Sequence, residues 1–407
     1  MDNLNILQLN EDKLRNGIIE YAQLDCKILY LILMKFNSLI FDLYNLNINN
    51  YPTLPSLAFG IFRSKYLSKN TVPLITGQLF KDINQSYTGE STEFILPYGE
   101  NLFYYDINSL YPYSMLKNNM PLGNIKAFEG DIFKKDPKAL GFFEAIINTP
   151  NKLNIPVLQI HNNNKTISPL GRFKGWFFSE ELKFARDNFG YNFEILRGYT
   201  FDDHNILHDY VNDLYNLRLQ YDKSHPMNFI AKILMNSVYG RFGLKPILNE
   251  FIIIDKDDLD DFIDTSDINE LFYLENKILL SFLDKNKINN NLQKSIASSE
   301  DIKSNIAVAR AVTAYSRIVL SEIKKFCLDN NIKIFYFDTD SIFIDQPLPE
   351  NLISKNIGQW KLEATIKEAV FIAPKVSGYI DNNGQEVVKF LIIYGSLIKL
   401  YSIYFLH

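Results

Sequence analysis

Cysteine, histidine and excess positive charge are all scarce in this chain. The two cysteines, Cys26 and Cys327, provide neither a disulfide framework nor metal-ligand spacing, and the five histidines form no zinc motif. The net charge is −5, so the chain as a whole does not have the composition of a nucleic-acid binder. Binding can still depend on a local patch or on metal ions, so only bulk electrostatic attraction is excluded.

The amino-acid sequence also shows no targeting or membrane signal. The N-terminus shows neither a secretory signal nor an Arg-rich presequence. Residues 26–46 are apolar but include Lys27, Lys35 and Asp42, which predicts a buried helix rather than a membrane span. The C-terminal stretch FLIIYGSLIKLYSIYFLH is short and contains Lys399, so we interpret it as an unfinished or aberrant chain end, and no membrane partner is expected.

What is present is enough for a sizeable core. The chain has 407 residues and is 47% hydrophobic, which predicts two or three domains. Phe (31) and Tyr (24) are abundant, Asn, Ile, Lys and Leu are frequent, and Ala is scarce. This bias is typical of A+T-rich coding genomes, as in many organelles.

The spacing of apolar residues and the positions of Pro, Gly and Asn predict the main helices and strands. Residues 1–46 are expected to be helical and 51–100 irregular, and strands broken by Pro, Gly and Asn are expected over 141–176. Helices are expected over 179–188, 206–221, 227–239 and, as a long amphipathic element, 302–329. Ser298 and Asp301 resemble a capping box for the last of these. The acidic run 255–267 has Asp260 where a calcium loop needs Gly, so it predicts a solvated surface element.

Two acids stand at an apolar hairpin in FYFDTDSIF (335–343). Strands are expected over 333–337 and 342–344, with Asp338 and Asp340 in the turn between them. Both acids have the same parity, so both side chains can point to one face, where they repel each other unless a cation lies between them. A solvated turn explains this stretch equally well when it is taken alone.

Two further stretches carry candidate site residues. NLFYYDINSLYPYSM (101–115) predicts a strand that ends at Asp106 and turns into a short helix. In the helix AKILMNSVYGRFG (231–243), Lys232, Asn236 and Tyr239 share one face, and Gly240 permits close backbone approach. A basic group, an amide and an aromatic ring suit a phosphate, a sugar and a base, although a structural role is as plausible for each stretch alone.

Together and in this order, the three stretches resemble the polymerase motifs of family B DNA polymerases. The motifs D-x-x-S-L-Y-P, K-x-x-x-N-S-x-Y-G and Y-x-D-T-D-S match the chain at 106–112, 232–240 and 336–341. The segments 53–67 and 211–223 are similar to the protein-primed branch, particularly polymerases of fungal and plant mitochondrial linear plasmids. The resemblance covers roughly residues 15–380.

The resemblance implies a two-metal site for phosphoryl transfer. Asp106 and Asp340 would converge on adjacent strand ends and bridge two Mg²⁺ ions, with Mn²⁺ as an alternative, while Asp338 would be a ligand or a supporting group. Thr339 and Ser341, in the same motif, would lie against DNA. The rigid strands would then explain why acids stand at an apolar hairpin tip.

The resemblance also implies which residues contact the nucleotide. Lys232 would contact the incoming triphosphate, with Arg218 as a weaker second contact. Asn236 and Tyr239 would line the nascent base-pair pocket, and Tyr111 would lie under the sugar and exclude a 2′-hydroxyl.

The chain also departs from the family pattern. Tyr21 and Asp25, in YAQLD, resemble the third exonuclease motif, but only twenty residues precede them, which predicts an exonuclease remnant. In SYTGE (86–90), Tyr87 and Gly89 match a Tyr-x-Gly-Gly element that contacts single-stranded template. In APKVSGY (373–379), Lys375 matches a Lys-x-Tyr primer-holding element whose Tyr is replaced by Ser377.

We therefore expect an α+β polymerase right hand. The expected parts are an exonuclease remnant (1–50), a connecting region (51–100), a palm (101–195 and 246–345), helical fingers (196–245) and a partial thumb (346–407). The expected function is mitochondrial, template-directed DNA synthesis on a DNA primer-template from dNTPs, with a terminal protein primer as a further partner. The alternatives are an inactive remnant that binds DNA, and a reverse transcriptase, whose paired acids are normally adjacent and not separated as they are here by Thr339.

Overall fold

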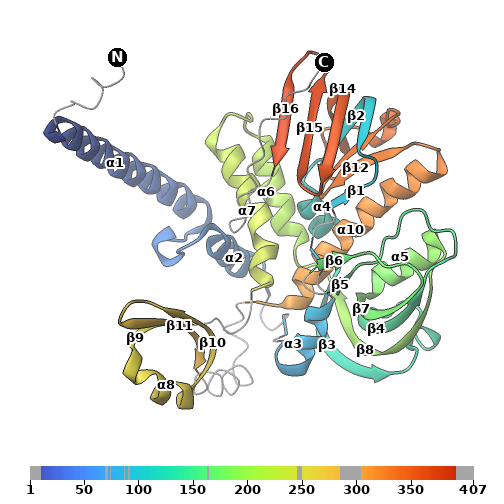
Figure 1. Cartoon of the computed structure of the whole chain (residues 1–407), viewed down its shortest axis with the longest axis horizontal. Helices are drawn as coiled ribbons and strands as arrows, with labels where there is room; N and C mark the ends of the chain where they lie inside the picture. Colours follow the sequence, from blue (N-terminus) through green and yellow to red (C-terminus); the bar gives the residue numbers. More distant parts are fainter. Residues whose placement is uncertain are drawn as a thin grey trace.

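The fold consists of helices and antiparallel sheets contributed by separate parts of the chain (Figure 1). The computed structural model describes residues 11–68, 72–73, 75–86, 88–89, 92–162, 165–244, 250–284 and 304–390. The α-helices are α1 (Glu11–Tyr44), α2 (Leu54–Lys65), α3 (Gly77–Gln85), α4 (Leu110–Lys117), α5 (Ser179–Phe189), α6 (His208–Leu219), α7 (Pro226–Phe242), α8 (Leu259–Thr265) and α10 (Ile306–Asp329). The strands are β1 (Thr92–Phe94), β2 (Tyr98–Ile107), β3 (Met120–Glu129), β4 (Leu140–Asn148), β5 (Ile160–Asn162), β6 (Lys165–Ile167), β7 (Arg172–Phe178), β8 (Asn192–His204), β9 (Glu250–Asp255), β10 (Ser266–Tyr273), β11 (Lys277–Asp284), β12 (Ile334–Asp338), β13 (Ser341–Ile344), β14 (Trp360–Ala373), β15 (Val376–Asp381) and β16 (Glu386–Phe390).

The largest sheet has seven strands in the order β1-β12-β13-β2-β14-β15-β16. Strand β2 lies at its centre, where Asp106 is opposite Ser341 of β13 on one side and Lys361 of β14 on the other. Strands β14 to β16 come from the stretch predicted as a partial thumb, yet they extend this sheet because β14 pairs with β2 along most of its length. The strand pairings therefore do not follow the predicted division at residues 345 and 346.

The two faces of this sheet carry separate apolar clusters. Helix α10 covers one face, where its residues Leu320 and Ile323 pack with Tyr105, Phe337 and other apolar side chains. The opposite cluster comprises Leu102, Tyr104, Phe335, Tyr336, Phe343, Ile366, Ala369 and Phe371. Because side chains alternate along a strand, Asp106 lies on the same side of the sheet as Leu102 and Tyr104. The candidate carboxylate is therefore directed away from the helix-covered face.

Helix α10 confirms the long helix but differs from the prediction in two ways. Ser298 and Asp301 lie outside the described residues, and the N-cap is Asn305, whose side chain accepts a hydrogen bond from the backbone N–H of Val308 (3.1 Å). The helix is also buried on most sides rather than along a single stripe, and Arg310, Arg317 and Lys324 are among its buried residues. These three polar positions are thus hydrogen-bonded or ion-paired inside the protein.

A second sheet, in the order β3-β8-β4-β7, confirms the broken strands predicted over 141–176. Helix α5 packs against it and ends at Gly190, as expected; Gly190 has a φ of 70°, in the left-handed region that glycine favours. The predicted helices at 206–221 and 227–239 are α6 and α7, separated by the N-cap His225 and by Pro226 at the first helical position. Strand β8 belongs to this sheet although its last residues lie within the predicted fingers.

Two expectations about the first hundred residues are wrong. The stretch 51–100 is not irregular, because it forms α2, α3 and β1; α2 begins with a capping box between Thr53 and Ser56. Helix α1 confirms the helical prediction, but it is not the expected buried helix: it projects from the body in Figure 1, and Leu29, Leu31 and Ile32 are more than half exposed. Among the described helices, none is long and apolar enough to cross a membrane.

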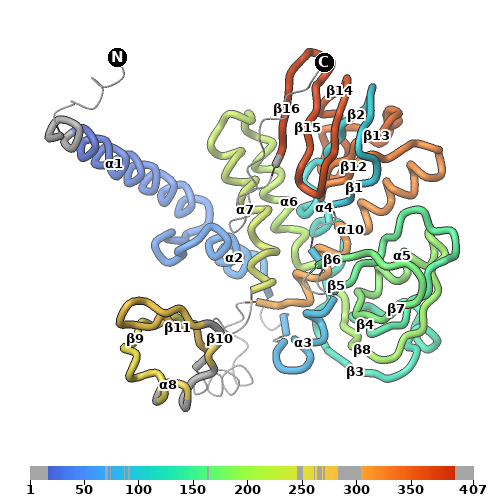
Figure 2. The backbone as a smooth tube through the Cα atoms, viewed as in Figure 1, coloured from blue at the N-terminus to red at the C-terminus, as the bar shows by residue number. Residues whose placement is uncertain are grey.

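The acidic run is at the surface, as predicted. Asp255, Asp257, Asp258 and Asp260 are exposed in the turn and short helix that join β9 to β10. Strands β9 and β10 belong to a third sheet, in the order β10-β11-β9, which Figure 2 shows apart from the seven-stranded sheet. The two cysteines form no disulfide, since Cys26 is exposed on α1 and Cys327 is buried under the main sheet.

Candidate active site

Three aspartates gather at one end of the seven-stranded sheet. Asp106 is near the end of β2, Asp338 ends β12, and Asp340 lies in the turn before β13. The backbone N–H of Ile107 donates to the carbonyl of Asp340 (2.8 Å), which places Asp340 directly beside the end of β2. The predicted hairpin is confirmed, and residues more than two hundred positions apart are brought together.

The Asp106 carboxyl group is electrostatically perturbed. Burial, and then the negative charges of Asp340 and Glu363, raise its pKa from its ordinary value of 3.8 to about 7. Glu363, on β14, escaped the sequence analysis because only the pairing of β14 with β2 brings it near Asp106. A divalent cation at this position would relieve the repulsion between these carboxylates.

The pKa of Asp106 predicts a pH effect on the metal-free chain. Its pKa in the folded state lies above its ordinary value, so folding favours the protonated form, and the stability that this provides is complete below about pH 4 and lost as pH rises through about 7. The melting temperature of EDTA-treated protein should therefore fall between about pH 4 and pH 7, and Asp106→Asn should reduce that fall. An equal fall in the variant would mean that other groups cause it.

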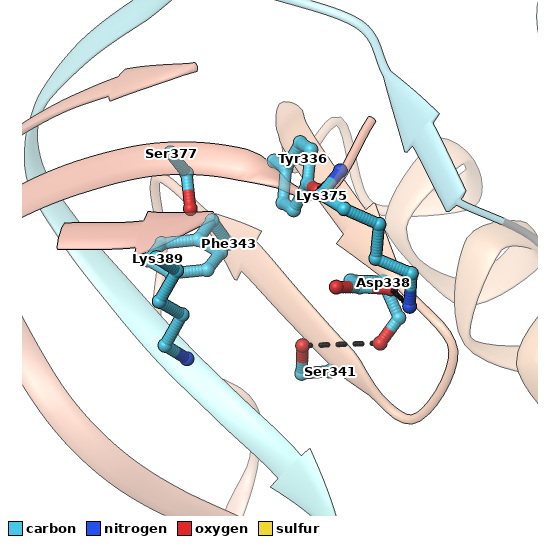
Figure 3. A pocket seen from close by; sticks show the side chains of 7 residues that line it. All are labelled: Tyr336, Asp338, Ser341, Phe343, Lys375, Ser377 and Lys389. Atoms are coloured by element: carbon cyan, nitrogen blue, oxygen red, sulfur yellow. Dashed lines mark hydrogen bonds and ion pairs between the residues drawn. The ribbon is translucent and has the colours of Figure 1, made fainter. Parts of the chain in front are cut away.

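Asp338 has a different environment from Asp106. Its Oδ1 accepts hydrogen bonds from Thr92 Oγ1 (2.9 Å) and Thr339 Oγ1 (3.3 Å) and forms an ion pair with Lys375. Figure 3 shows Lys375 and Asp338 together at a cavity of about 170 Å³ that is also lined by Tyr336, Ser341, Phe343, Ser377 and Lys389. The charge of Asp338 is thus paired with a cation of the chain itself, whereas Asp106 lies near the carboxylates of Asp340 and Glu363 as well as near Lys361 and Lys389.

The donor set suits Mg²⁺ bound together with a substrate. Within the described residues, no three His, Cys, Asp or Glu side chains form a ready-made metal cluster. Mg²⁺ is commonly held by one or two carboxylates plus substrate phosphates and water, rather than by a protein cage. The pair of Asp106 and Asp340 fits that mode, because the charge of Asp340 and burial both act on Asp106, and Lys361 and Lys389 oppose them only in part.

Strained backbone gathers at the same place. Among the described residues other than Gly and Asn, the positive φ angles belong to Ser109 (55°), Thr339 (57°) and Lys375 (65°). A β-branched residue such as Thr339 rarely adopts this conformation. Ser109 follows Asp106 in the first motif, Thr339 separates the hairpin acids, and Lys375 pairs with Asp338. Such conformations persist where the surrounding structure holds them, commonly at functional sites.

Helix α7 presents the predicted face. Leu234, Met235 and Val238 are buried, whereas Lys232 is exposed and Asn236 is partly exposed. A Cβ at Gly240 would meet no described atom within 4 Å, so any need for glycine there concerns a bound molecule rather than the protein.

The first motif has one side-chain contact with α7 and one with α6. Tyr239 of α7 stacks on Tyr111, with ring centroids 4.6 Å apart and planes inclined by 20°. Arg218 of α6 donates through Nη1 to Ser109 Oγ (3.3 Å). Two of the predicted nucleotide contacts, Tyr239 and Arg218, therefore contact the first motif, which itself contains a third, Tyr111.

Most of the predicted DNA contacts lie within the described residues. Tyr87 lies outside the described residues, and Gly89 would place a Cβ in open space. Ser341 donates to the Asp338 carbonyl (3.2 Å), and Ser377 is buried in the wall of the cavity. The exonuclease-like Tyr21 and Asp25 are exposed on α1.

One basic residue of the cavity was missed by the sequence analysis. Lys389, on β16, donates to Tyr104 Oη (2.9 Å) and lines the same cavity as Lys375. It stands alone in an apolar stretch, and no sequence motif marks it. Only the addition of β16 to the edge of the sheet brings it to the cavity.

Comparison with known proteins agrees with this geometry. Residues 5–326 match the family described as DNA polymerase type B, organellar and viral. A probable DNA polymerase of Ascobolus immersus is 35% identical over 91% of this chain, and one of Neurospora intermedia is 33% identical over 93%. The chain spans 30% and 40% of the lengths of these two relatives.

The fold is shared with a solved polymerase. The structure of Phi29 DNA polymerase complexed with primer-template DNA and incoming nucleotide substrates aligns with a TM-score of 0.63 at 18% identity, over 83% of this chain and 60% of that one. This likeness confirms a mixed α+β polymerase fold. The motif resemblance to family B is confirmed as well, and the chain belongs to the organellar and viral type B DNA polymerases.

Proposed function

We propose that this chain adds dNTPs to the 3′ end of a primer on a DNA template. The main support is the position of Asp106 beside Asp340 at adjacent strand ends, where burial and the charge of Asp340 raise the pKa of Asp106. Phosphoryl transfer depends mainly on positioning and charge neutralisation, and two divalent ions, when bound, would activate the primer hydroxyl and neutralise the leaving pyrophosphate. Asp106 and Asp340 would hold these ions, and Asp338 would support them.

The roles of the other site residues are proposed from the place of each residue in the motifs that resemble the family. Lys232 would contact the triphosphate, Asn236 would line the base-pair pocket with Tyr239, and Arg218 would act through its contact with Ser109. Thr339 and Ser341 would lie near the primer terminus, with Lys375 holding the primer strand. Tyr87 and Gly89 would contact the template. The subdomain limits, a mitochondrial location, plasmid replication and a terminal protein primer belong to this proposal as well.

A second candidate function is DNA binding without synthesis. It is favoured by Ser377, which is buried where the resemblance expects an accessible primer-holding tyrosine. The charge of Lys375 is also paired with Asp338, although about a third of the lysine side chain is exposed.

Primer extension separates the two candidates. The purified chain is incubated with a 5′-labelled primer on a longer template, dNTPs and Mg²⁺, and DNA binding is measured in parallel by fluorescence anisotropy. We expect extension that requires both Mg²⁺ and template. Binding without incorporation at any Mg²⁺ or Mn²⁺ concentration would favour the second candidate.

Tyr111 provides a test of sugar selection. If its ring, held by stacking on Tyr239, occupies the space of a 2′-hydroxyl, then Tyr111→Ala should reduce dNTP-over-rNTP selectivity by roughly tenfold or more. Tyr111→Phe is the matched control because it keeps the ring and should keep the selectivity. Single-nucleotide incorporation kinetics measure both, and unchanged selectivity in the alanine variant would place the discrimination elsewhere.

A further inference from the structure

Helix α10 carries a row of three buried basic residues. Arg310, Arg317 and Lys324 are spaced seven residues apart, which is close to two helical turns, so they lie on one face of α10. Their exposed fractions are 7%, 7% and 3%. A buried charge is costly unless it is paired or hydrogen-bonded, so each of these side chains needs partners inside the protein. We call these three residues the basic row.

The three members of the basic row contact, in turn, the end of α3, Thr88 between α3 and β1, and β1 itself. Arg310 donates to Asn84 Oδ1 (2.7 Å), Arg317 donates to the Thr88 carbonyl (2.6 Å), and Lys324 pairs with Glu93 (2.6 Å). Arg317 also forms a bidentate pair with Glu181 of α5 (2.8 and 3.0 Å). The partners at 84, 88 and 93 follow the same order as the row, so these three positions lie along the helix in chain order.

The last of these partners, Glu93, lies in β1 beside the candidate active site. Glu93, the partner of Lys324, is adjacent to Thr92, and β1 pairs with β12 so that Thr92 is opposite Asp338. Thr92 Oγ1 donates to Asp338 Oδ1 (2.9 Å). Strand β1 is a short edge strand with a single neighbour in its sheet, so side-chain anchors such as Lys324 supplement its few ladder hydrogen bonds.

We propose that Thr92 is a positioning residue for the Asp338 carboxylate and that the basic row holds Thr92 in place. This inference rests on the proposed function, in which Asp338 supports the metal site. A hydrogen bond from Thr92 fixes the orientation of the carboxylate and adds no charge, whereas Lys375, on the same oxygen, also neutralises it. Loss of such an outer partner commonly weakens metal binding or activity about 10- to 100-fold.

The test compares Thr92→Val, which keeps the shape of the side chain but removes its hydroxyl, with Thr92→Ser, which keeps the hydroxyl. Mn²⁺ is titrated into the full chain with a non-hydrolysable dNTP present, and free Mn²⁺ is measured by electron paramagnetic resonance. We expect Thr92→Val to weaken Mn²⁺ binding about tenfold and to raise the Mg²⁺ concentration for half-maximal extension similarly. Thr92→Ser should bind as the unmodified chain does.

The basic row is tested by the double variant Glu93→Met/Lys324→Met, which removes both charges and leaves neither unpaired. Its Mn²⁺ binding should weaken in the same direction, with thermal melting confirming that it folds. Lys325→Met is the matched control, since it removes a solvent-accessible ion pair with Asp329 on the same helix and should have no effect.

Three outcomes would overturn the inference: identical Mn²⁺ isotherms for Thr92→Val and the unmodified chain, equal weakening by Thr92→Ser, or an unchanged isotherm in the folded double variant. The predicted isotherms in a chain that extends no primer would support the positioning role and refute the proposed synthesis, so the two failures are distinguishable.

Discussion

Asp340→Asn and Asp106→Asn should each reduce primer extension at least about a thousandfold while leaving the fold intact. Each substitution removes one of the two negative charges that would balance the divalent ions, and each retains nearly the same shape. The expected loss is in the rate at saturating DNA and dNTP, because the ions act on the reacting phosphate. Rapid-quench measurement of single-nucleotide incorporation reports that rate directly.

The control is another aspartate of the same hairpin. Asp345 follows β13 at the opposite end from the turn, and its Oδ1 accepts from the backbone N–H of Lys333 (2.8 Å). Asp345→Asn keeps this acceptor and should extend primers at nearly the unmodified rate. If Asp340→Asn were as active as Asp345→Asn, the assignment of Asp340 to the metal site would be wrong.

Arg317→Met should destabilise the folded chain by about 3–5 kcal/mol. Arg317 is 7% exposed and Glu181 is 9% exposed, so removal of the guanidinium leaves a buried carboxylate without its partner and the Thr88 carbonyl without its donor. Burial of an unpaired charge is among the largest effects that one substitution can have. Urea denaturation followed by circular dichroism measures the change.

Two further variants identify the cause of that loss. Glu181→Leu/Arg317→Met removes the whole buried pair, and it should be markedly more stable than Arg317→Met because no charge remains unpaired. Arg186→Met removes the ion pair with Asp187 on the exposed face of α5 and should change stability by less than about 1 kcal/mol. A single Arg317 variant as stable as Arg186→Met would show that the pair contributes little.

The local sequence was sufficient to predict those elements whose limits depend on neighbouring residues. Proline, glycine and capping residues predicted the limits of α5 and of α6 and α7 to within a few residues, since a helix end depends on its own backbone and on adjacent side chains. The hairpin acids and the polar face of α7 could likewise be predicted from the sequence, because turn residues and helical spacing are properties of short stretches. The stretch 51–100 was misread because its Pro, Gly and Ser residues resemble a loop, although Pro55 lies in the first turn of α2, where it is tolerated.

By itself, then, the sequence determined the three motifs, their order, and hence the family and the candidate carboxylates. Only the tertiary structure decided the neighbours of each carboxylate: Glu363 beside Asp106, and Thr92 and Lys375 on Asp338. It also decided that β14 to β16 extend the central sheet, and that the buried basic residues of α10 contact Asn84, Thr88 and Glu93. The physical reason is that strand pairing and buried ion pairs join residues far apart in the chain, and no periodicity within one segment records the register at which distant segments meet.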